Sequence, residues 1–283
     1  MSHLTLLDDA SVQRKSLLRL YFSNILDLLE FYYFLSRLTR IPILGSVFLK
    51  GIINFYGFNY HTGMALPLSE ILTLLEQANY ITVSHCACRT LYPRCSRPLM
   101  TCLYINTGGQ VYLDKGILPK QRIDKDKAKE IVTESVKRGM LLAFEWCLPP
   151  YSYAICSCCS CCCLPRKLRF EYGIEAALQA GPFYPIRKDV ACISCQSCAG
   201  ICPGRAISGS DGDWQLDQTA CIGCGLCAEG CPQQALEMVP GRPLKRLKQE
   251  PGFIKKNLLW LGAITILLPL AFGFASIRRI RKI

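Results

Sequence analysis

Hydrophobic residues near the start of the chain recur with the period of a helix. In residues 15–40, Leu, Ile, Phe and Tyr fill a wide face, and polar residues return at steps of three or four. These polar positions are Arg19, Ser23, Asp27 and Glu30. The pattern predicts helices over residues 12–60. Charges inside the run argue against a membrane span, so the apolar face either packs on the protein's own core or lies in a membrane interface.

Two units of a helix followed by a strand come next. The first helix follows Ser69, a residue type that caps helices, and leads into a β-prone run at residues 81–83. The second helix ends at Gly139 and leads into another apolar run. Between them, CLYINTGGQVYL predicts a hairpin turning at Gly108 and Gly109. We expect a small α/β domain over residues 66–185 whose loops present cysteines.

The end of the chain has a different pattern. Residues 241–256 form a basic linker, and residues 257–276 contain no charge over twenty positions. A helix of that length reaches about 30 Å, which is the thickness of a hydrocarbon core. We predict a single transmembrane helix followed by a basic tail over residues 277–283. A buried helix of a soluble domain is the alternative.

Charge and cysteine content narrow the functional classes. The chain of 283 residues has a formal net charge of +12, three histidines and 19 cysteines. A basic protein suits an anionic membrane surface or an acidic partner protein. The odd cysteine count argues against a disulfide framework, and the polar start argues against a secretory leader. We therefore expect cysteines that bind metal in the cytosol, and no nucleic-acid partner, because no recognition motif is present.

Eight of the cysteines form two matched runs, each with the spacing Cys-x2-Cys-x2-Cys-x3-Cys-Pro. The first run contains Cys192, Cys195, Cys198 and Cys202, and the second contains Cys221, Cys224, Cys227 and Cys231. In this bacterial pattern the fourth cysteine of each run ligates the other cluster. The runs therefore predict two [4Fe-4S] clusters. One has the ligands Cys192, Cys195, Cys198 and Cys231, and the other has the ligands Cys221, Cys224, Cys227 and Cys202.

A zinc site is the alternative for these runs, but zinc prefers two CxxC pairs separated by a longer loop. Over residues 185–240 the chain resembles bacterial-type two-cluster ferredoxins. The resemblance implies one-electron transfer by a two-cluster domain at residues 186–240, in which the polypeptide supplies position and electrostatics.

Ten further cysteines lie upstream in two groups. They are Cys86, Cys88, Cys95 and Cys102, and then Cys156, Cys158, Cys159, Cys161, Cys162 and Cys163. Adjacent side chains diverge in both strands and helices, so the second group suggests two sites, or one site with nearby reactive thiols. We predict one or two further Fe–S clusters here. Zinc and free redox thiols are the alternatives, and Cys147 is expected to be a buried free cysteine.

Two residues beside the first upstream group have two interpretations each. His85 either ligates or hydrogen-bonds a cluster, or it is structural, which we favour. Arg89 either neutralises a reduced cluster or forms a surface salt bridge.

The order of these motifs also resembles a group of iron–sulfur proteins from anaerobic bacteria and archaea. The resemblance rests on CxCR, two spaced cysteines, the CxCCxCCC run and the two-cluster repeat, and covers residues 66–240. It implies electron transfer in anaerobic metabolism. Neither Cys147 nor the C-terminal span is carried over from this group.

The predicted fold class is α+β. It combines N-terminal helices over residues 1–65, the cysteine-rich domain, the ferredoxin-like domain and one transmembrane helix. We expect a single-pass protein of the cytoplasmic membrane with its clusters facing the cytosol. Its predicted function is to pass single electrons to or from a redox partner protein or a membrane oxidoreductase complex. No Walker A loop, GxGxxG fingerprint or catalytic residue is identified. A subunit with a catalytic upstream cluster and a redox or oxygen sensor are the alternatives.

Overall fold

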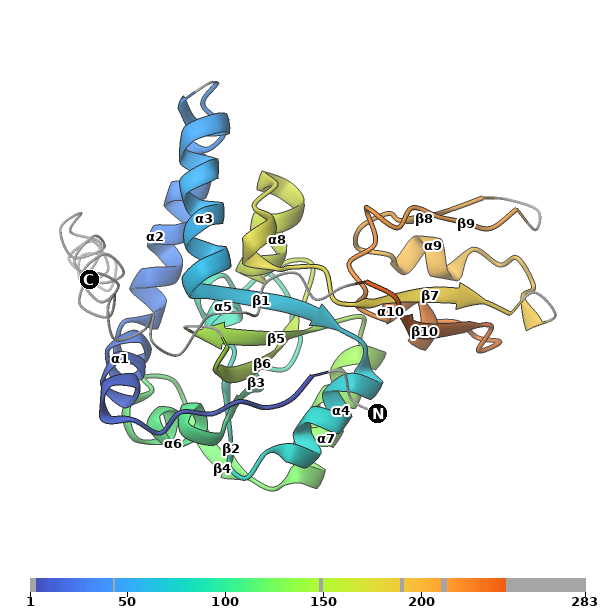
Figure 1. Ribbon diagram of the computed structural model, residues 1–283. Helices are drawn as coiled ribbons and strands as arrows, with labels where there is room; N and C mark the ends of the chain where they lie inside the picture. Colours follow the sequence, from blue (N-terminus) through green and yellow to red (C-terminus); the bar gives the residue numbers. More distant parts are fainter. Residues whose placement is uncertain (1–3, 43, 148–149, 189–190, 210–212, 243–283) are drawn as a thin grey trace.

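The computed structural model describes residues 4–42, 44–147, 150–188, 191–209 and 213–242. The N-terminal region is helical, as predicted. It contains α1 (Val12–Ser23), α2 (Ile25–Leu38), a π-helical turn (Leu44–Leu49) and α3 (Lys50–Tyr60). The Ser11 hydroxyl caps α1 by accepting a hydrogen bond from the Arg14 backbone N–H at 3.3 Å. The helices α2 and α3 project from one end of the molecule (Figure 1).

A six-stranded sheet forms the centre of the molecule, with the strand order β1-β5-β6-β3-β2-β4 (Figure 1). The strands are β1 (His61–Leu66), β2 (Ile81–His85), β3 (Met100–Ile105), β4 (Lys120–Ile123), β5 (Leu141–Cys147) and β6 (Ser152–Cys158). Every described pair in this sheet is antiparallel. This arrangement agrees with the predicted mixed fold, and β1 spans the predicted domain boundary at residues 65–66.

The two faces of the sheet carry different helices. The helices α4 (Leu68–Gln77) and α7 (Lys125–Lys137) pack together over the largest core, which includes Ile71, Leu74, Val132 and Phe144. A second core joins α1 and α6 (Asn106–Lys115) to strands β3 and β6 through aromatic rings. Five cysteines lie in or beside this second core, so the aromatic face of the sheet is also the sulfur-rich face.

The predicted hairpin at Gly108 and Gly109 is wrong, because these residues lie in α6. A Cβ added to Gly108 would lie 2.6 Å from the Tyr153 carbonyl oxygen, and one on Gly109 would lie 2.7 Å from that of Tyr104. The glycines therefore allow the helix to approach the sheet closely. Glycine pairs also occur in turns, so the sequence pattern alone does not separate the two uses. The helix cap predicted at Ser69 is also wrong, since Pro67 holds that position.

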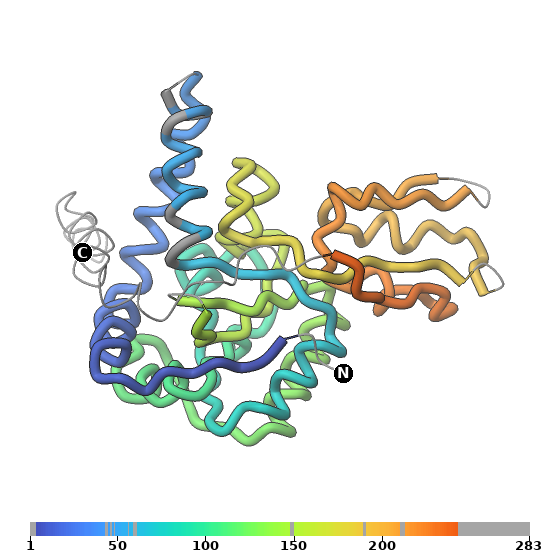
Figure 2. Tube along the Cα trace, viewed as in Figure 1, coloured from blue at the N-terminus to red at the C-terminus, as the bar shows by residue number. Residues whose placement is uncertain are grey.

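The rest of the described chain forms a short helical segment and the ferredoxin-like unit. The segment contains α8 (Leu164–Tyr172) and a 3-10 turn (Glu175–Ala177). The unit contains β7 (Phe183–Arg187), α9 (Ser197–Ile201), β8 (Ile207–Ser208), β9 (Gln215–Leu216), α10 (Leu226–Glu229) and β10 (Leu236–Pro240). Strand β7 pairs with β10, and β8 pairs with β9. The trace in Figure 2 shows this unit extending from the end of the main sheet, and Phe183, Ile222 and Leu226 pack into the main core.

Among the described residues, no helix combines the length and the apolar character that a membrane crossing requires. The predicted span at residues 257–276, the basic tail and most of the linker lie outside the described residues.

An ion pair ties the first residues to the sheet. The Arg14 side chain is 1% exposed and contacts Asp8 Oδ1 at 2.8 Å, and its second amino group donates to the Ser152 carbonyl oxygen at 2.8 Å. Asp8 Oδ2 also accepts a hydrogen bond from the Thr107 hydroxyl at 2.8 Å. Asp8 therefore links α1 to the start of α6 and balances the positive charge of the buried Arg14 guanidinium.

We expect Asp8→Ala to destabilise the protein because it leaves the Arg14 charge buried without its partner. Loss of a partly buried pair of this kind costs about 2 kcal/mol, which lowers the melting temperature by about 4–8 °C for a chain of this size. Anaerobic thermal unfolding measures the change. Asp114→Ala is the control, since Asp114 forms an exposed pair with Lys115, and an equal effect of both variants would contradict the buried-pair account.

Candidate metal centres

The two cysteine runs of the ferredoxin-like unit have the same local backbone. Three equivalent pairs of positions have positive φ: Ser194 and Gly223, Gln196 and Gly225, and Arg205 and Gln234. A side chain in this left-handed region costs about 1 kcal/mol per residue, and four of the six positions are not glycine. Both halves keep this turn despite its energetic cost. This indicates that the turn orients the backbone amides and the thiols in the same way in each half.

The structure brings the eight cysteines into two separate cavities. One cavity is lined by Cys192, Cys195, Cys198 and Cys231, and the other is lined by Cys202, Cys221, Cys224 and Cys227. Each cavity thus takes three cysteines from one run and the fourth from the other, as the predicted ligand sets require.

Backbone amides also point at the exchanged sulfurs. The Ala206 N–H donates to Cys202 Sγ and the Ala235 N–H donates to Cys231 Sγ, both at 3.3 Å. Such hydrogen bonds stabilise thiolates and tune the potential of a bound cluster. Thiolate donors, an apolar wall and amide donors together fit a pair of iron–sulfur cubanes.

The two cavities differ in exposure. Cys195 in the first cavity is exposed, and the Ser197 hydroxyl lowers its pKa by hydrogen bonding. Burial raises the pKa of Cys224 in the second cavity to about 12, and the nearby guanidinium of Arg166 partly opposes this effect. The first cavity therefore faces solvent, and the second faces the cysteine-rich domain.

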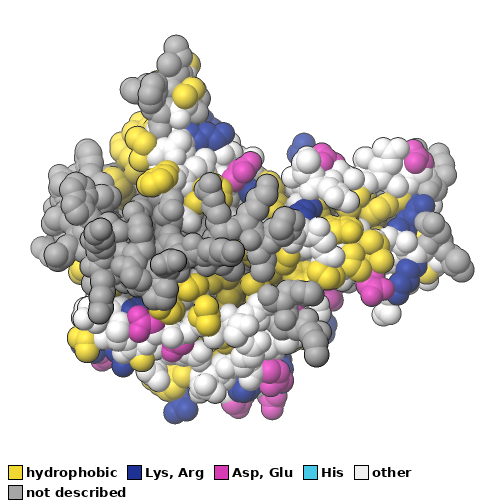
Figure 3. Space-filling view, viewed as in Figure 1, with side chains coloured by type: hydrophobic (Ala, Val, Ile, Leu, Met, Phe, Trp, Pro, Cys, Tyr) yellow, Lys and Arg dark blue, Asp and Glu magenta, His cyan; other side chains and the backbone are white. Residues whose placement is uncertain are grey.

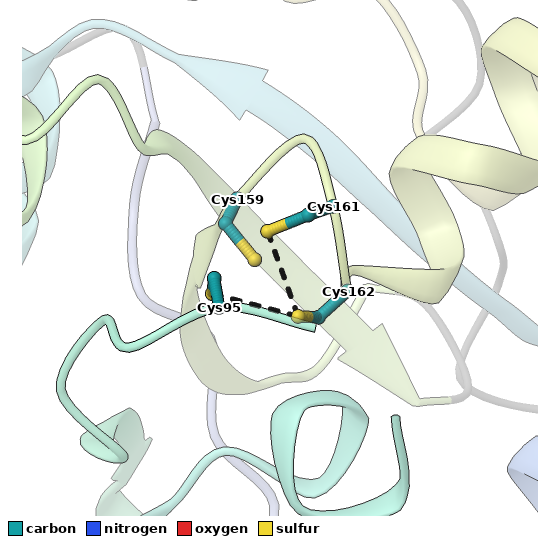
Figure 4. Close-up of side chains that lie close together, drawn as sticks. All are labelled: Cys95, Cys159, Cys161 and Cys162. Atoms are coloured by element: carbon teal, nitrogen blue, oxygen red, sulfur yellow. Dashed lines mark hydrogen bonds between the residues drawn. The ribbon is translucent and has the colours of Figure 1, made fainter. Parts of the chain in front are cut away.

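Four upstream sulfurs form a compact group, here called the sulfur quartet. Its members are Cys95, Cys159, Cys161 and Cys162, and their Sγ atoms all lie within 4.8 Å of one another (Figure 4). Cys162 Sγ lies 3.5 Å from Cys95 Sγ and 3.6 Å from Cys161 Sγ. The adjacent residues Cys161 and Cys162 share one site because they lie in a turn after β6, where the divergence expected in a strand or helix does not apply.

The spacing within the quartet is short. The sulfurs of one tetrahedral zinc ion lie about 3.8 Å apart, because each Zn–S bond is about 2.3 Å long. The quartet therefore has a spacing close to that of the ligands of one tetrahedral ion, and it must open to accept a cubane.

The other six upstream cysteines form a second group, here called the sulfur row. Its thiols perturb one another's pKa in pairs, in the order Cys156, Cys102, Cys86, Cys88, Cys163 and Cys158, so they lie as neighbours in a row. Cys102 and Cys156 lie on the adjacent strands β3 and β6, Cys88 lies in the short helix α5 (Ala87–Leu91), and Cys163 precedes α8. The cysteines thus come from strands and a helix as well as from loops, which the sequence did not predict.

One buried cation lies between the quartet and the row. The Arg89 side chain is 1% exposed and donates to the Thr101 hydroxyl at 2.8 Å, the Ser157 carbonyl oxygen at 2.7 Å and the Pro98 carbonyl oxygen. No carboxylate pairs with it in the described part of the chain. The surface salt bridge considered from the sequence is therefore wrong.

Sulfur atoms are the potential counter-charges of Arg89. Burial alone would lower the pKa of Arg89, but its electrostatic interaction with the sulfurs of Cys86, Cys102, Cys159 and Cys158 raises it. Interaction with Cys156 raises the pKa of Cys102, and burial raises the pKa of Cys158 to about 12, so these two thiols need a bound metal to become thiolates at neutral pH. The pKa of Cys86 is in turn lowered well below its usual value, first by hydrogen bonds from neighbouring thiols and then by Arg89. A buried guanidinium without a counter-charge is costly, so this position favours metal-bound thiolates in the sulfur groups beside it.

The remaining residues considered from the sequence lie apart from these groups. Cys147 is buried outside both, and burial raises its pKa to about 11, as expected for an inert thiol. His85 ends β2, and within the described residues no hydrogen bond joins its ring to a sulfur.

Sequence reasoning missed Arg166, which lies between two sites. It stands in the first turn of α8, which begins directly after Cys163 of the row, and its side-chain charge acts on Cys224 in the second cavity. Its position three residues after the last cysteine of the run was the available signal.

Comparison with known proteins supports part of this picture. Residues 191–236 match the family model described as a 4Fe-4S dicluster domain. No curated protein and no solved structure matches the chain. Together with the cavities, this match shows an iron–sulfur domain of ferredoxin type that carries [4Fe-4S] clusters, with a cysteine-rich cluster site upstream.

We expect Arg89→Gln to make the upstream reduction potential more negative, because it removes a cation beside the sulfur groups. The shift is on the order of 100 mV for a unit charge a few ångströms away at an effective dielectric constant of about 20. EPR-monitored redox titration measures it, with Arg89→Lys expected to recover part of the potential.

Arg122→Gln is the matched control, because Arg122 is exposed on β4 and stacks on Tyr80. An upstream potential that stays unchanged in Arg89→Gln, with full iron content, would contradict the role of Arg89.

Proposed function

We propose that the protein conducts single electrons between a redox partner at its ferredoxin-like unit and clusters in the cysteine-rich domain. The observation that carries this proposal is the buried Arg89, whose positive charge lies among upstream sulfurs that raise its pKa, in a chain that also contains a domain of the [4Fe-4S] type. The sulfur row offers six ligands, enough for one cubane with two further thiols or for a larger cluster. The ligand roles of all eighteen cysteines in the cavities, the quartet and the row are part of the proposal.

The order of the sites supports a route for the electrons. Cys195 of the first cavity is exposed, so a partner protein can approach that cluster closely. The second cavity follows, and Arg166, three residues after Cys163 of the row, acts electrostatically on Cys224. Electrons therefore enter at the solvent end, cross the paired cubanes and reach the upstream sulfurs, or travel in reverse.

A membrane location agrees with the surface of the N-terminal helices. The side chains of Val47, Ile52 and Phe55 are 64%, 65% and 66% exposed on the projecting helical pair. Hydrophobic side chains appear on the same projection in the space-filling view (Figure 3). An apolar projection on a basic protein suits insertion into the interface of an anionic membrane. We include this contact and the C-terminal span in the proposal, with the clusters on the cytosolic side and a membrane oxidoreductase complex or a cytosolic protein as partner.

A second function has one specific observation in its favour. The quartet is compact enough for one tetrahedral ion, so the upstream domain also suits a structural or sensing metal beside a catalytic cluster in the row. Anaerobic metal analysis separates the two cases. Zinc at one equivalent favours the second function, and about twelve to sixteen irons per chain favour a full set of clusters, given four irons in each cubane.

The route itself is tested with Cys195→Ser in the anaerobically prepared holoprotein. We expect the solvent-end cluster to be lost or altered, and reduction of the upstream clusters by a reduced one-electron carrier protein to slow at least tenfold, because the entry site is removed. Rapid-freeze EPR follows the upstream signals. Cys147→Ser is the control, and equal upstream reduction rates in the Cys195 variant and the wild type would contradict the proposed route.

A further inference from the structure

A largely apolar cavity lies between the N-terminal helices and the sheet. Its volume is about 80 Å³, several times the roughly 10–15 Å³ that one water molecule needs. Residues of α2, α3, β1, β5 and α8 line it, and most are aliphatic, including Leu28, Leu29, Ile53, Leu164 and Leu168. The metal centres described above do not use this space.

One wall of the cavity is polar. Glu145 is 3% exposed, and its Oε1 atom has no hydrogen-bond partner among the described residues. The residue opposite it on β1 is Gly63, where a Cβ would collide with the Glu145 carboxyl group. The glycine thus leaves room for the carboxyl group, which occupies the apolar site at the cost of an unsatisfied oxygen.

His61 lies on the same wall. Its Nε2 atom is 3.2 Å from the Tyr153 hydroxyl and 3.4 Å from the Tyr21 hydroxyl. Burial raises the pKa of Glu145 to about 8 and lowers the pKa of His61 to about 4. At neutral pH the wall therefore presents an uncharged carboxyl group and an uncharged imidazole, which suits a neutral ligand with an oxygen that accepts a hydrogen bond.

The cavity also adjoins the sulfur row. Leu164 and Pro165, which line it, directly follow Cys163 in the sequence. Cys88 packs against the hydrophobic cluster that contains Leu164 and Leu168. The sulfur row therefore lies directly behind the side chains that form the wall of the cavity.

The helices that line the cavity also bear the exposed apolar projection. Leu28, Leu29 and Tyr32 come from α2, and Ile53 comes from α3, on which Ile52 and Phe55 face outward. A molecule dissolved in an apolar phase can thus reach the cavity along apolar side chains.

We propose that this cavity binds the ring of a neutral quinone-type molecule and that its carbonyl oxygen accepts a hydrogen bond from Glu145. The inference rests on the proposed electron-transfer function and names the chemical class of the upstream electron acceptor. The aliphatic walls contact the ring, and the polar wall orients one carbonyl group.

The electron and proton counts of the reduction balance. The quinone takes two electrons in two successive one-electron steps, each of which oxidises an upstream cluster by one electron. The Glu145 carboxyl group gives one proton to the bound carbonyl oxygen and is reprotonated from solvent, and the second oxygen takes its proton from water. The products are the quinol and oxidised clusters, which a one-electron carrier protein reduces again through the ferredoxin-like unit.

Binding is tested with duroquinone, whose fully substituted ring resists addition of thiols, and with the oxidised full-length holoprotein. Equilibrium dialysis is expected to give one site per chain. Glu145→Leu removes the hydrogen-bond donor and should weaken binding at least about tenfold, the effect of a buried hydrogen bond. Ala177→Leu fills the cavity and should abolish binding with unchanged iron content. Glu134→Gln is the control, because Glu134 is exposed in an ion pair with Lys137.

Turnover gives a second readout. Glu145→Gln keeps a hydrogen-bond donor but has no acidic proton, so it should bind duroquinone within about threefold of wild type, since donation to the carbonyl is retained, and form quinol at least tenfold more slowly. Equal binding by wild type, Glu145→Leu and Ala177→Leu would overturn the site. If these variants behave as wild type while Cys195→Ser still blocks upstream reduction, the quinone site fails and the proposed electron route stands. If upstream reduction is unaffected by Cys195→Ser, the route fails independently of duroquinone binding.

Discussion

The need to compensate one buried positive charge governs the cysteine-rich half of the protein. Arg89 is held by a hydroxyl and two carbonyl oxygens, which orient its guanidinium but do not neutralise it. The nearby groups that can carry negative charge are sulfurs of the row and the quartet. Because Arg89 is 1% exposed, we propose that metal-bound thiolates in these groups supply its counter-charge at neutral pH. On this proposal, the arginine of the CxCR motif links the stability of the fold to the presence of metal.

The fold places the sulfur groups so that they lie in series. Strands β3 and β6 bring Cys102 and Cys156 side by side, and the turn after β6 divides the following cysteines between the row and the quartet. Arg166 in the first turn of α8, which begins directly after Cys163 of the row, acts electrostatically on Cys224 in the buried cavity of the ferredoxin-like unit. One short stretch of chain thus contributes to three neighbouring sites, which explains why so many cysteines are concentrated there. The apolar cavity beside the row is the site at which the proposed reduction combines electrons from the clusters with a proton from Glu145.

The periodic and repeated features of the sequence could be predicted, and the long-range ones could not. The N-terminal helices, the strand at residues 81–83 and the two cysteine runs follow from local spacing, and the exchange of Cys202 and Cys231 between cavities follows from a rule for that spacing. Glycine has more than one structural use, so Gly108 and Gly109 suggested a turn where the chain packs a helix onto the sheet. The division of ten upstream cysteines into six and four depends on which strands pair, and the sequence does not specify pairing across such distances. Glu145 gave no signal, because one carboxylate in an apolar run becomes informative only when its partners are known.

The central claim is that iron occupies the upstream sulfur groups around Arg89. Anomalous X-ray diffraction from anaerobically grown crystals, measured on both sides of the iron absorption edge, tests it directly. The account predicts iron peaks in both cavities of the ferredoxin-like unit and at least one further peak within the sulfur row. Iron confined to the two cavities, with the row holding no metal beside Arg89, would contradict it.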